Sequence, residues 1–144
     1  MMTANIPESH LDLLLEPVHG VLTTMMPDGQ PQMSIVWVDF DGEHVLLNST
    51  LERQKGKNMQ ENPKVNVLVI DPNNEVRFLE IRGRVIEITP DGAIDHADKQ
   101  TRAYSNGRKQ KFYGDIYPKE TKDKETRVIF KILPKKITTD AIFS

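Results

Sequence analysis

The chain has 144 residues, no cysteine and a formal net charge of −2. This length is typical of one domain, so residues 1–144 are expected to fold as a single unit. The lack of cysteine excludes disulfide scaffolds, thiolate metal sites and cysteine nucleophiles. The small net charge argues against a nucleic-acid-binding protein. No apolar run approaches the ~20 residues of a membrane span, and the first residues lack signal-peptide features, so we expect a cytoplasmic protein that does not enter a membrane.

The first half of the chain has the pattern of one short helix and three strands. Apolar residues at helical spacing predict the helix over residues 8–16. The strands that follow are predicted at residues 21–26, 32–39 and 45–50. Turn residues at Pro27-Asp28-Gly29 and Phe40-Asp41-Gly42 separate these strands, which predicts a three-stranded meander.

The second half continues with a polar helix over residues 51–62 and an alternating strand that contains Val65, Val67 and Val69. The longest strand is predicted over residues 76–89, where Gly83 indicates a bulge or a bend.

Thr89 is predicted to cap another helix. Residues 105–125 are polar and contain three aromatic residues, which indicates a flexible insertion or a lid. A last strand is predicted over residues 127–133, ended by Pro134. Together these elements predict a mainly β protein, a six-stranded antiparallel barrel with two or three short helices.

The sequence contains no standard catalytic or metal-binding motif. The four histidines are far apart, and neither a nucleophile elbow nor a Gly-rich phosphate loop is present. We therefore predict no metal site and leave the catalytic residues unassigned. A barrel of this size without its own reactive group often takes its chemistry from a cofactor.

One basic segment, Arg53-Gln54-Lys55-Gly56-Lys57-Asn58, follows the strand residues Asn48, Ser49 and Thr50. Three cations at the start of a helix, beside hydroxyl donors, suit a phosphate or a carboxylate. The alternative is a solvated basic helix face. Trp37, the only tryptophan, either packs in the core or lines a planar ligand.

The order of these segments resembles the pyridoxamine-phosphate-oxidase-like split barrels, in particular the small branch that uses the deazaflavin coenzyme F-420. The resemblance covers most of the chain and weakens between residues 105 and 125. The stretches that carry it are Gly20-Val21-Leu22-Thr23-Thr24, Asp28-Gly29-Gln30-Pro31-Gln32-Met33-Ser34, Leu46-Leu47-Asn48-Ser49-Thr50, Arg53 to Asn58, Asn62-Pro63-Lys64-Val65, Leu79-Glu80-Ile81-Arg82-Gly83-Arg84-Val85 and Val128-Ile129-Phe130-Lys131-Ile132-Leu133-Pro134.

The resemblance implies a Greek-key split barrel that forms a homodimer, with the cofactor at the interface and a small-molecule substrate against it. Arg53, Lys55 and Lys57 would bind the cofactor phosphate. Asn48, Ser49, Thr50 and Asn58 would assist them, and Ser34 to Trp37, including Val36, would pass along the ring. Phe78 would come from the partner chain. Trp37 and Tyr104 are candidates for substrate contacts, and water, Tyr104 or Tyr113 for the proton donor.

The resemblance implies hydride transfer between reduced coenzyme F-420 and a small unsaturated or electron-poor substrate. FMN is the alternative cofactor, because both coenzymes present a phosphate and a tricyclic ring. A carrier without turnover is a further alternative, as is a heme-utilisation barrel, which would require a suitably placed histidine. The C-terminal extension of true pyridoxamine-phosphate oxidases is not recognised, so vitamin B6 oxidation is not predicted.

Overall fold

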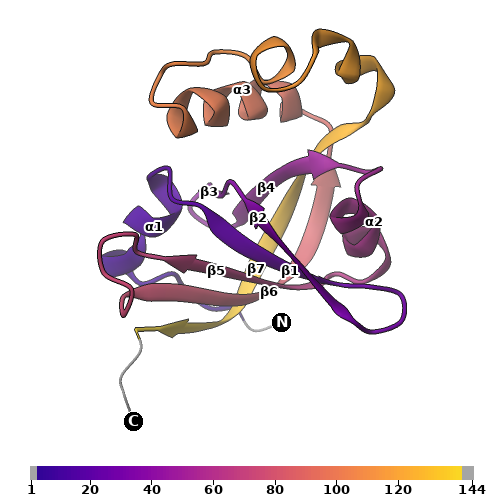
Figure 1. The fold of residues 1–144 in the computed structure, drawn as a ribbon. Coiled ribbons are helices and arrows are strands. Elements are labelled where there is room, and N and C mark those ends of the chain that lie inside the picture. The colour runs from indigo at the N-terminus through magenta and orange to yellow at the C-terminus, as the bar shows by residue number, and fades with distance from the viewer. Residues whose placement is uncertain (1–2, 141–144) are drawn as a thin grey trace.

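The computed structural model describes residues 3–140 and contains one curled, antiparallel sheet of seven strands (Figure 1). Neighbouring strands follow the order β2-β1-β5-β6-β7-β4-β3. Their bounds are β1 Gly20–Met25, β2 Pro31–Val36, β3 Asp39–Phe40, β4 Val45–Thr50, β5 Lys64–Ile70, β6 Phe78–Thr89 and β7 Arg127–Thr139. The mainly β class is confirmed, whereas the predicted count of six strands is wrong by one.

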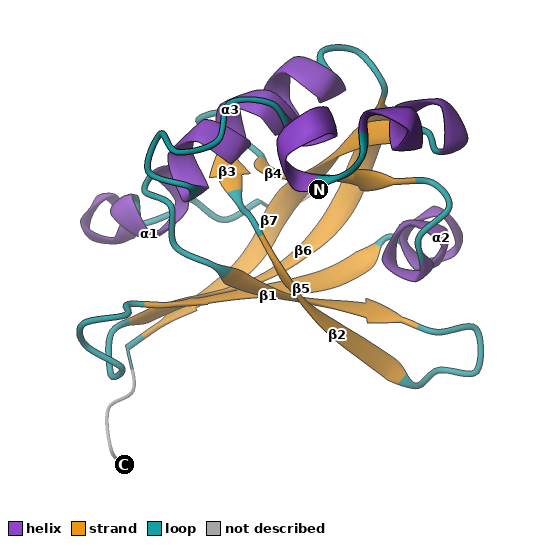
Figure 2. Cartoon of the chain, turned by 45° about the horizontal axis from the view of Figure 1, so that its top comes forward, coloured by secondary structure: helices purple, strands orange, loops and turns teal. Residues whose placement is uncertain are grey.

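The helices lie around the rim of this sheet. Their bounds are η1 Glu8–His10, α1 Asp12–Leu15, α2 Gln54–Glu61, α3 Ala93–Tyr104, and the short turns η2 Phe112–Ile116 and η3 Lys119–Lys124. Figure 2 shows α1 and α2 at opposite sides of the curled sheet, with α3 and the turns after it over one end. Helix α3 begins after Gly92, which has a φ of 70°, and not at the predicted cap Thr89.

The predicted meander is wrong, because β4 pairs with β7 and not with β2. The chain leaves the ladder after β2, where the backbone N–H of Val38 donates to the Tyr104 hydroxyl at 3.0 Å. It then forms the additional short strand β3, which pairs with the start of β4. The Tyr104 hydroxyl of α3 therefore accepts the backbone hydrogen bond that a neighbouring strand would accept in the predicted meander.

The core lies inside the curl of the sheet and follows the predicted two-residue alternation. Leu79, Ile81 and Val85 of β6 are buried, as are Val65, Val67 and Val69 of β5. The bulge predicted at Gly83 is confirmed, since the β6–β7 register shifts between Arg82 and Gly83. A Cβ atom at Gly83 would lie 2.6 Å from the Ile132 side chain, so this close approach requires glycine.

Strand β7 is longer than predicted and is the longest strand of the described part of the chain. It continues through Pro134 to Thr139, because Pro134 lies opposite Gly83 at the register shift. A proline is tolerated at such a bulge, where the ladder is already interrupted.

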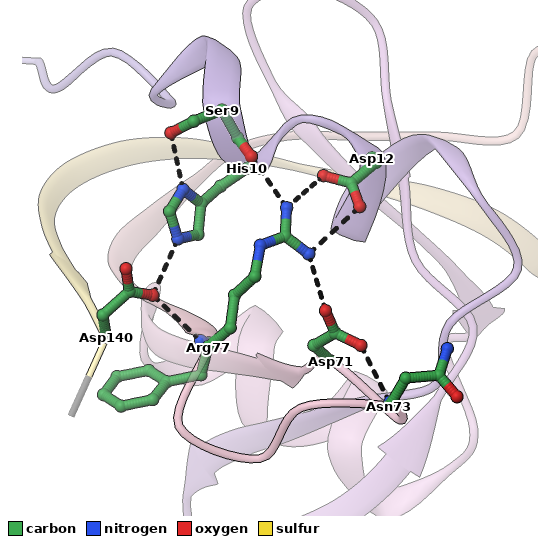
Figure 3. A network of polar contacts seen from close by, with 8 residues as sticks. Ser9, His10, Asp12, Asp71, Asn73, Arg77 and Asp140 are labelled. Atoms are coloured by element: carbon green, nitrogen blue, oxygen red, sulfur yellow. Dashed lines mark hydrogen bonds and ion pairs between the residues drawn. The ribbon is translucent and has the colours of Figure 1, made fainter.

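A polar network ties the N-terminal helices to the β5–β6 turn and to the end of β7 (Figure 3). Arg77 donates to both carboxylate oxygens of Asp12 and, at 2.9 Å, to Asp71. The buried His10 lies 2.9 Å from Asp140. None of the residues of this network lines the pocket described next.

Candidate functional site

A pocket of about 200 Å³ lies where the ends of β2 and β4, the start of α2 and the turn η2 meet. We call it the basic pocket. Its lining residues are Ile35, Val36, Trp37, Asn48, Ser49, Arg53, Lys55, Phe112, Ile116, Tyr117 and Arg127.

Aromatic side chains form one wall of the basic pocket. Trp37 stacks on Tyr104 with ring centroids 5.0 Å apart and an interplanar angle of 13°. Phe112 meets Trp37 edge-on at 6.2 Å and packs against Tyr117 at 5.3 Å. Such rings offer a flat apolar surface that suits a planar ligand.

Three cations meet at the same pocket. The Arg53 guanidinium lies 5.0 Å from the centroid of the Tyr117 ring, and that of Arg127 lies 4.2 Å from the Phe112 ring. Burial lowers the pKa of the Lys55 ammonium, and the charges of Arg53 and Arg127 lower it further. Among residues 3–140, no carboxylate lies within 4.0 Å of the Arg53 or Lys55 charge. An anion in the pocket would relieve the repulsion among the charges of Arg53, Lys55 and Arg127.

Arg127 is held rigidly, although it belongs to the pocket wall. Its side chain is only 4% exposed and pairs with Glu125 at 3.2 Å. Its Nε donates to the Tyr113 hydroxyl at 2.9 Å, and its Nη1 donates to Oδ1 of Asn48 at 2.8 Å. A guanidinium carries five N–H donors. Three of these donors make the contacts above, and the two that remain are on the Nη atoms.

Ser49 supplies a further polar group to the pocket. Its hydroxyl is buried and has no hydrogen-bond partner in the described part of the chain. A buried polar atom without a partner is costly, and in native proteins it calls for an explanation. An anionic ligand that accepts this hydrogen bond fits the cations around it.

The structure brings together six of the predicted site residues. Val36, Trp37, Asn48, Ser49, Arg53 and Lys55 all line the basic pocket. The other six, which do not line it, are Ser34, Thr50, Lys57, Asn58, Phe78 and Tyr104.

Several of these six already use their polar groups to hold the fold. The Thr50 hydroxyl accepts the backbone N–H of Arg53 at 3.2 Å. The Asn58 amide donates to Thr24 at 3.0 Å, which fastens α2 to the β1–β2 hairpin. The Tyr104 hydroxyl donates to the carbonyl oxygen of Val18 at 2.9 Å. These contacts position the pocket wall and leave the groups themselves little capacity for a ligand.

Lys57 and Phe78 lie at two other concave surfaces. Lys57 lines a groove of about 680 Å³ between α2 and the β1–β2 hairpin, together with the carboxylate of Glu61. Phe78 lines an outer groove of about 360 Å³ with Met33 and Glu80. The groove at Lys57 is larger than the basic pocket, but its lining residues include one cation and one carboxylate, so their charges balance. We therefore place the candidate anion site in the basic pocket.

The sequence interpretation missed Arg127 and did not assign the polar stretch 105–125. This stretch is folded, and its turn η2 carries Phe112, Ile116 and Tyr117 into the pocket wall. Two hydrogen bonds to carboxylates hold it, from the Phe112 backbone N–H to Asp98 and from that of Gln110 to Asp115. The aromatic residues within a polar stretch were the signal for this wall, whereas nothing near residue 127 marked Arg127.

The described residues, 3–140, contain no cluster of three or more side chains suited to a metal ion. None of their helices is long and apolar enough to cross a membrane.

The fold and the pocket define a small curled-sheet protein with a basic, aromatic-walled pocket. The sequence profile of the pyridoxamine 5'-phosphate oxidase family matches residues 6–140, so the chain belongs to this family, as its motifs predicted.

Solved structures agree with this assignment. A protein named F420 reductase shares 36% sequence identity with a TM-score of 0.78, covering 92% of this chain and 98% of that one. A putative pyridoxamine 5'-phosphate oxidase from Listeria innocua shares 25% identity with a TM-score of 0.62, covering 92% and 95%. A conserved hypothetical protein from Mycobacterium tuberculosis, at 20% identity and a TM-score of 0.66, covers 97% and 89% and shares the fold. A search of curated proteins gave no match.

Proposed function

We propose that this protein is an oxidoreductase that binds a flavin or deazaflavin coenzyme in the basic pocket. In its specific form, the proposal is hydride transfer between reduced coenzyme F-420 and a small unsaturated or electron-poor substrate. The observation that carries it is the convergence of Arg53, Lys55 and the unpartnered Ser49 hydroxyl beside an aromatic wall. The similarity to a protein named F420 reductase supports the deazaflavin form.

The residues of the pocket divide into two groups by their chemistry. Arg53, Lys55 and the Ser49 hydroxyl would bind the phosphate through charge-assisted hydrogen bonds. Val36 and Trp37 would lie along the ring. The bound coenzyme would supply the hydride chemistry, and the protein would orient the reactants.

Neither tyrosine considered as a proton donor is free in the structure. Burial raises the pKa of the Tyr104 phenol, and burial likewise raises that of Tyr113. The Tyr104 hydroxyl donates to Val18, and the Tyr113 hydroxyl donates to Glu125 at 2.7 Å. These contacts favour solvent water as the proton source in the proposed reaction.

A second copy of the chain is part of the proposal. The basic pocket, at about 200 Å³, is smaller than the roughly 300–1,000 Å³ of ordinary ligand sites. At its rim, Ile35 is 71% exposed, and Met33 on the same strand face is 66% exposed. A partner chain on this apolar face would cover it and enlarge the site. Phe78 lies in the outer groove beside Met33, where a partner would meet it.

FMN is the second candidate ligand, because its phosphate and ring suit the same residues. The deciding experiment titrates the purified protein with coenzyme F-420, FMN and riboflavin in parallel and follows ring fluorescence. Tighter binding of F-420 supports the specific proposal, and tighter binding of FMN moves the protein to the FMN branch. Riboflavin, which has no phosphate, should bind weakest. If none of the three binds, the proposed function fails.

Binding alone would not distinguish an enzyme from a carrier. The F-420 complex should therefore be reduced and mixed with candidate electron-poor acceptors while the deazaflavin absorbance is followed. Reoxidation that depends on both protein and acceptor supports the oxidoreductase. Stoichiometric binding without any reoxidation would instead indicate a carrier.

A further inference from the structure

Asn48 connects the pocket residue Arg127 to helix α3 in a fixed orientation. Its Oδ1 accepts a hydrogen bond from Arg127 at 2.8 Å, and its Nδ2 donates to the carbonyl oxygen of Ala93 at 2.7 Å. A guanidinium can only donate and a carbonyl can only accept, so these two contacts determine which end of the amide carries the oxygen. The same Nδ2 lies 3.0 Å from Nδ1 of His96, which must therefore act as an acceptor.

The other nitrogen of His96 faces a carboxylate. Nε2 lies 2.9 Å from Oδ2 of Asp39, so the neutral imidazole carries its proton there. Lys99 donates to the same Asp39 oxygen at 3.1 Å. The His96 and Asp39 side chains are 9% and 13% exposed, so water competes little for these contacts. Three hydrogen bonds thus run from Asp39 through His96 and Asn48 to Arg127.

We propose that Asp39 and His96 are positioning residues that hold Asn48, and through it the guanidinium of Arg127, toward an anion in the basic pocket. The identity of this anion as a coenzyme phosphate rests on the proposed function. The hydrogen-bond chain itself does not depend on it.

The three hydrogen bonds from Asp39 to Arg127 can form together only while the His96 imidazole is neutral. If His96 gained a second proton, its Nδ1–H would face the donor Nδ2 of Asn48. The amide cannot turn over to relieve this, because its oxygen would then face the oxygen of Ala93 and its NH₂ group would face Arg127. Protonation of His96 therefore breaks the His96–Asn48 contact and weakens the hold of Asn48 on Arg127, which keeps its bonds to Glu125 and Tyr113.

The charged groups around His96 act in opposite directions. Asp39, from β3, attracts a proton to the imidazole, whereas Lys99 on α3 offsets that carboxylate. From β7, the Arg127 cation opposes protonation through Asn48, and Glu125 partly neutralises it. The weakening of the Asn48–Arg127 contact accordingly accompanies protonation of His96.

The first test needs no ligand. Nitrogen-15 NMR of the full chain should show Nε2 of His96 protonated and Nδ1 unprotonated at a pH of about 8, with a protected Arg127 Nη1–H signal. On acidification, the imidazole and the Arg127 signal should change together. Titration of His96 with an unchanged Arg127 signal would overturn the proposal, whether or not any coenzyme binds.

The second test compares His96→Gln with His96→Ala. The glutamine amide can accept a hydrogen bond from Asn48 and donate one to Asp39, but unlike histidine it cannot gain a proton on acidification. At a pH of about 8, His96→Gln should bind FMN with an affinity close to that of the unmodified protein, and His96→Ala about tenfold more weakly. On acidification, the unmodified protein should lose affinity relative to His96→Gln.

Two comparisons make this readout specific. The FMN phosphate itself titrates near a pH of about 6, so each affinity is compared between proteins at one pH. Riboflavin, which lacks the phosphate, should show no such difference between the unmodified protein and His96→Gln. If the FMN affinities of the unmodified protein and of His96→Gln changed with pH in the same way, the positioning role would be refuted. Failure of the unmodified protein to bind any coenzyme would refute the proposed function alone, because the NMR test would still decide the role of His96.

Discussion

A Cβ atom at Gly56 would lie 1.9 Å from the carbonyl oxygen of Thr50. Helix α2 therefore packs directly against the end of β4, and this approach sets Arg53 and Lys55 beside Ser49. Glycine at position 56 is a requirement of the pocket as well as of the fold.

Replacing Gly56 by alanine should destabilise the protein. The added methyl group meets backbone, which cannot rotate away, so we expect a loss of at least about 1–3 kcal/mol in the free energy of unfolding. Urea denaturation followed by circular dichroism measures it. Glu61→Ala, at an exposed position of the same helix, should change stability by no more than about 0.5 kcal/mol. Equal stability of the two variants would show that α2 is free to move away from β4.

Removing the pocket cations should weaken coenzyme binding. Arg53→Ala and Lys55→Ala each delete a charge-assisted hydrogen bond to the phosphate, which corresponds to a loss in affinity of roughly ten- to hundredfold. Fluorescence titration with FMN or F-420 gives the dissociation constants. Lys64→Ala removes the same charge from an exposed position of β5 and should bind as the unmodified protein does. Unchanged affinity in the two pocket variants would refute the phosphate site.

Lys57 tests how far the ligand extends along α2. The sequence pattern grouped it with Arg53 and Lys55, but its side chain lines the groove beside the β1–β2 hairpin. We expect Lys57→Ala to retain affinity for FMN within about threefold, because it makes no contact with the basic pocket. A loss as large as that of Lys55→Ala would place the phosphate across both surfaces.

The exposed face of β2 should mediate dimer formation. Ile35→Glu places a charge on an apolar face that a partner would bury, so the variant should sediment near the monomer mass of 16.5 kDa. The unmodified protein should sediment at about twice that mass. Leu15→Glu, at an apolar residue of α1 that is 58% exposed, should leave the dimer intact. A monomeric unmodified protein at micromolar concentration would contradict the composite site.

Because of Asp39, the free energy of unfolding should decrease at acid pH. Burial raises the pKa of its carboxyl, but hydrogen bonds from His96, the Phe40 N–H and Lys99 outweigh burial and lower it from 3.8 to about 2. A lowered folded-state pKa stabilises the protein above the unfolded value, and this contribution is lost as the pH falls from about 4 to about 2. Asp39→Asn should therefore cost about 2 kcal/mol at neutral pH.

Urea unfolding of the two proteins between pH 7 and pH 2 measures this cost, and the difference should shrink toward the acid end. The exposed Asp95→Asn serves as the control on the same helix that carries His96. A difference between Asp39→Asn and the unmodified protein that stays constant with pH would show that Asp39 acts by packing alone.

Most of the local elements and one half of the proposed site residues could be predicted from the amino-acid sequence. The alternation of Leu79, Ile81 and Val85 placed the buried face of β6, because side chains of a strand point alternately to its two faces. The segment from Arg53 to Lys55 followed β4 closely in sequence, so its position beside Ser49 was predictable from local order.

Which strands pair, and which distant residues enter the pocket, became clear only from the folded chain. Alternation fixes the faces of a strand but not its neighbour, so the pairing of β4 with β7 was not predictable from periodicity. That pairing brings Arg127 to Asn48, 79 positions away in the chain. Lys57, two residues after Lys55 along α2, points to another side of the helix and lines the groove beside the β1–β2 hairpin.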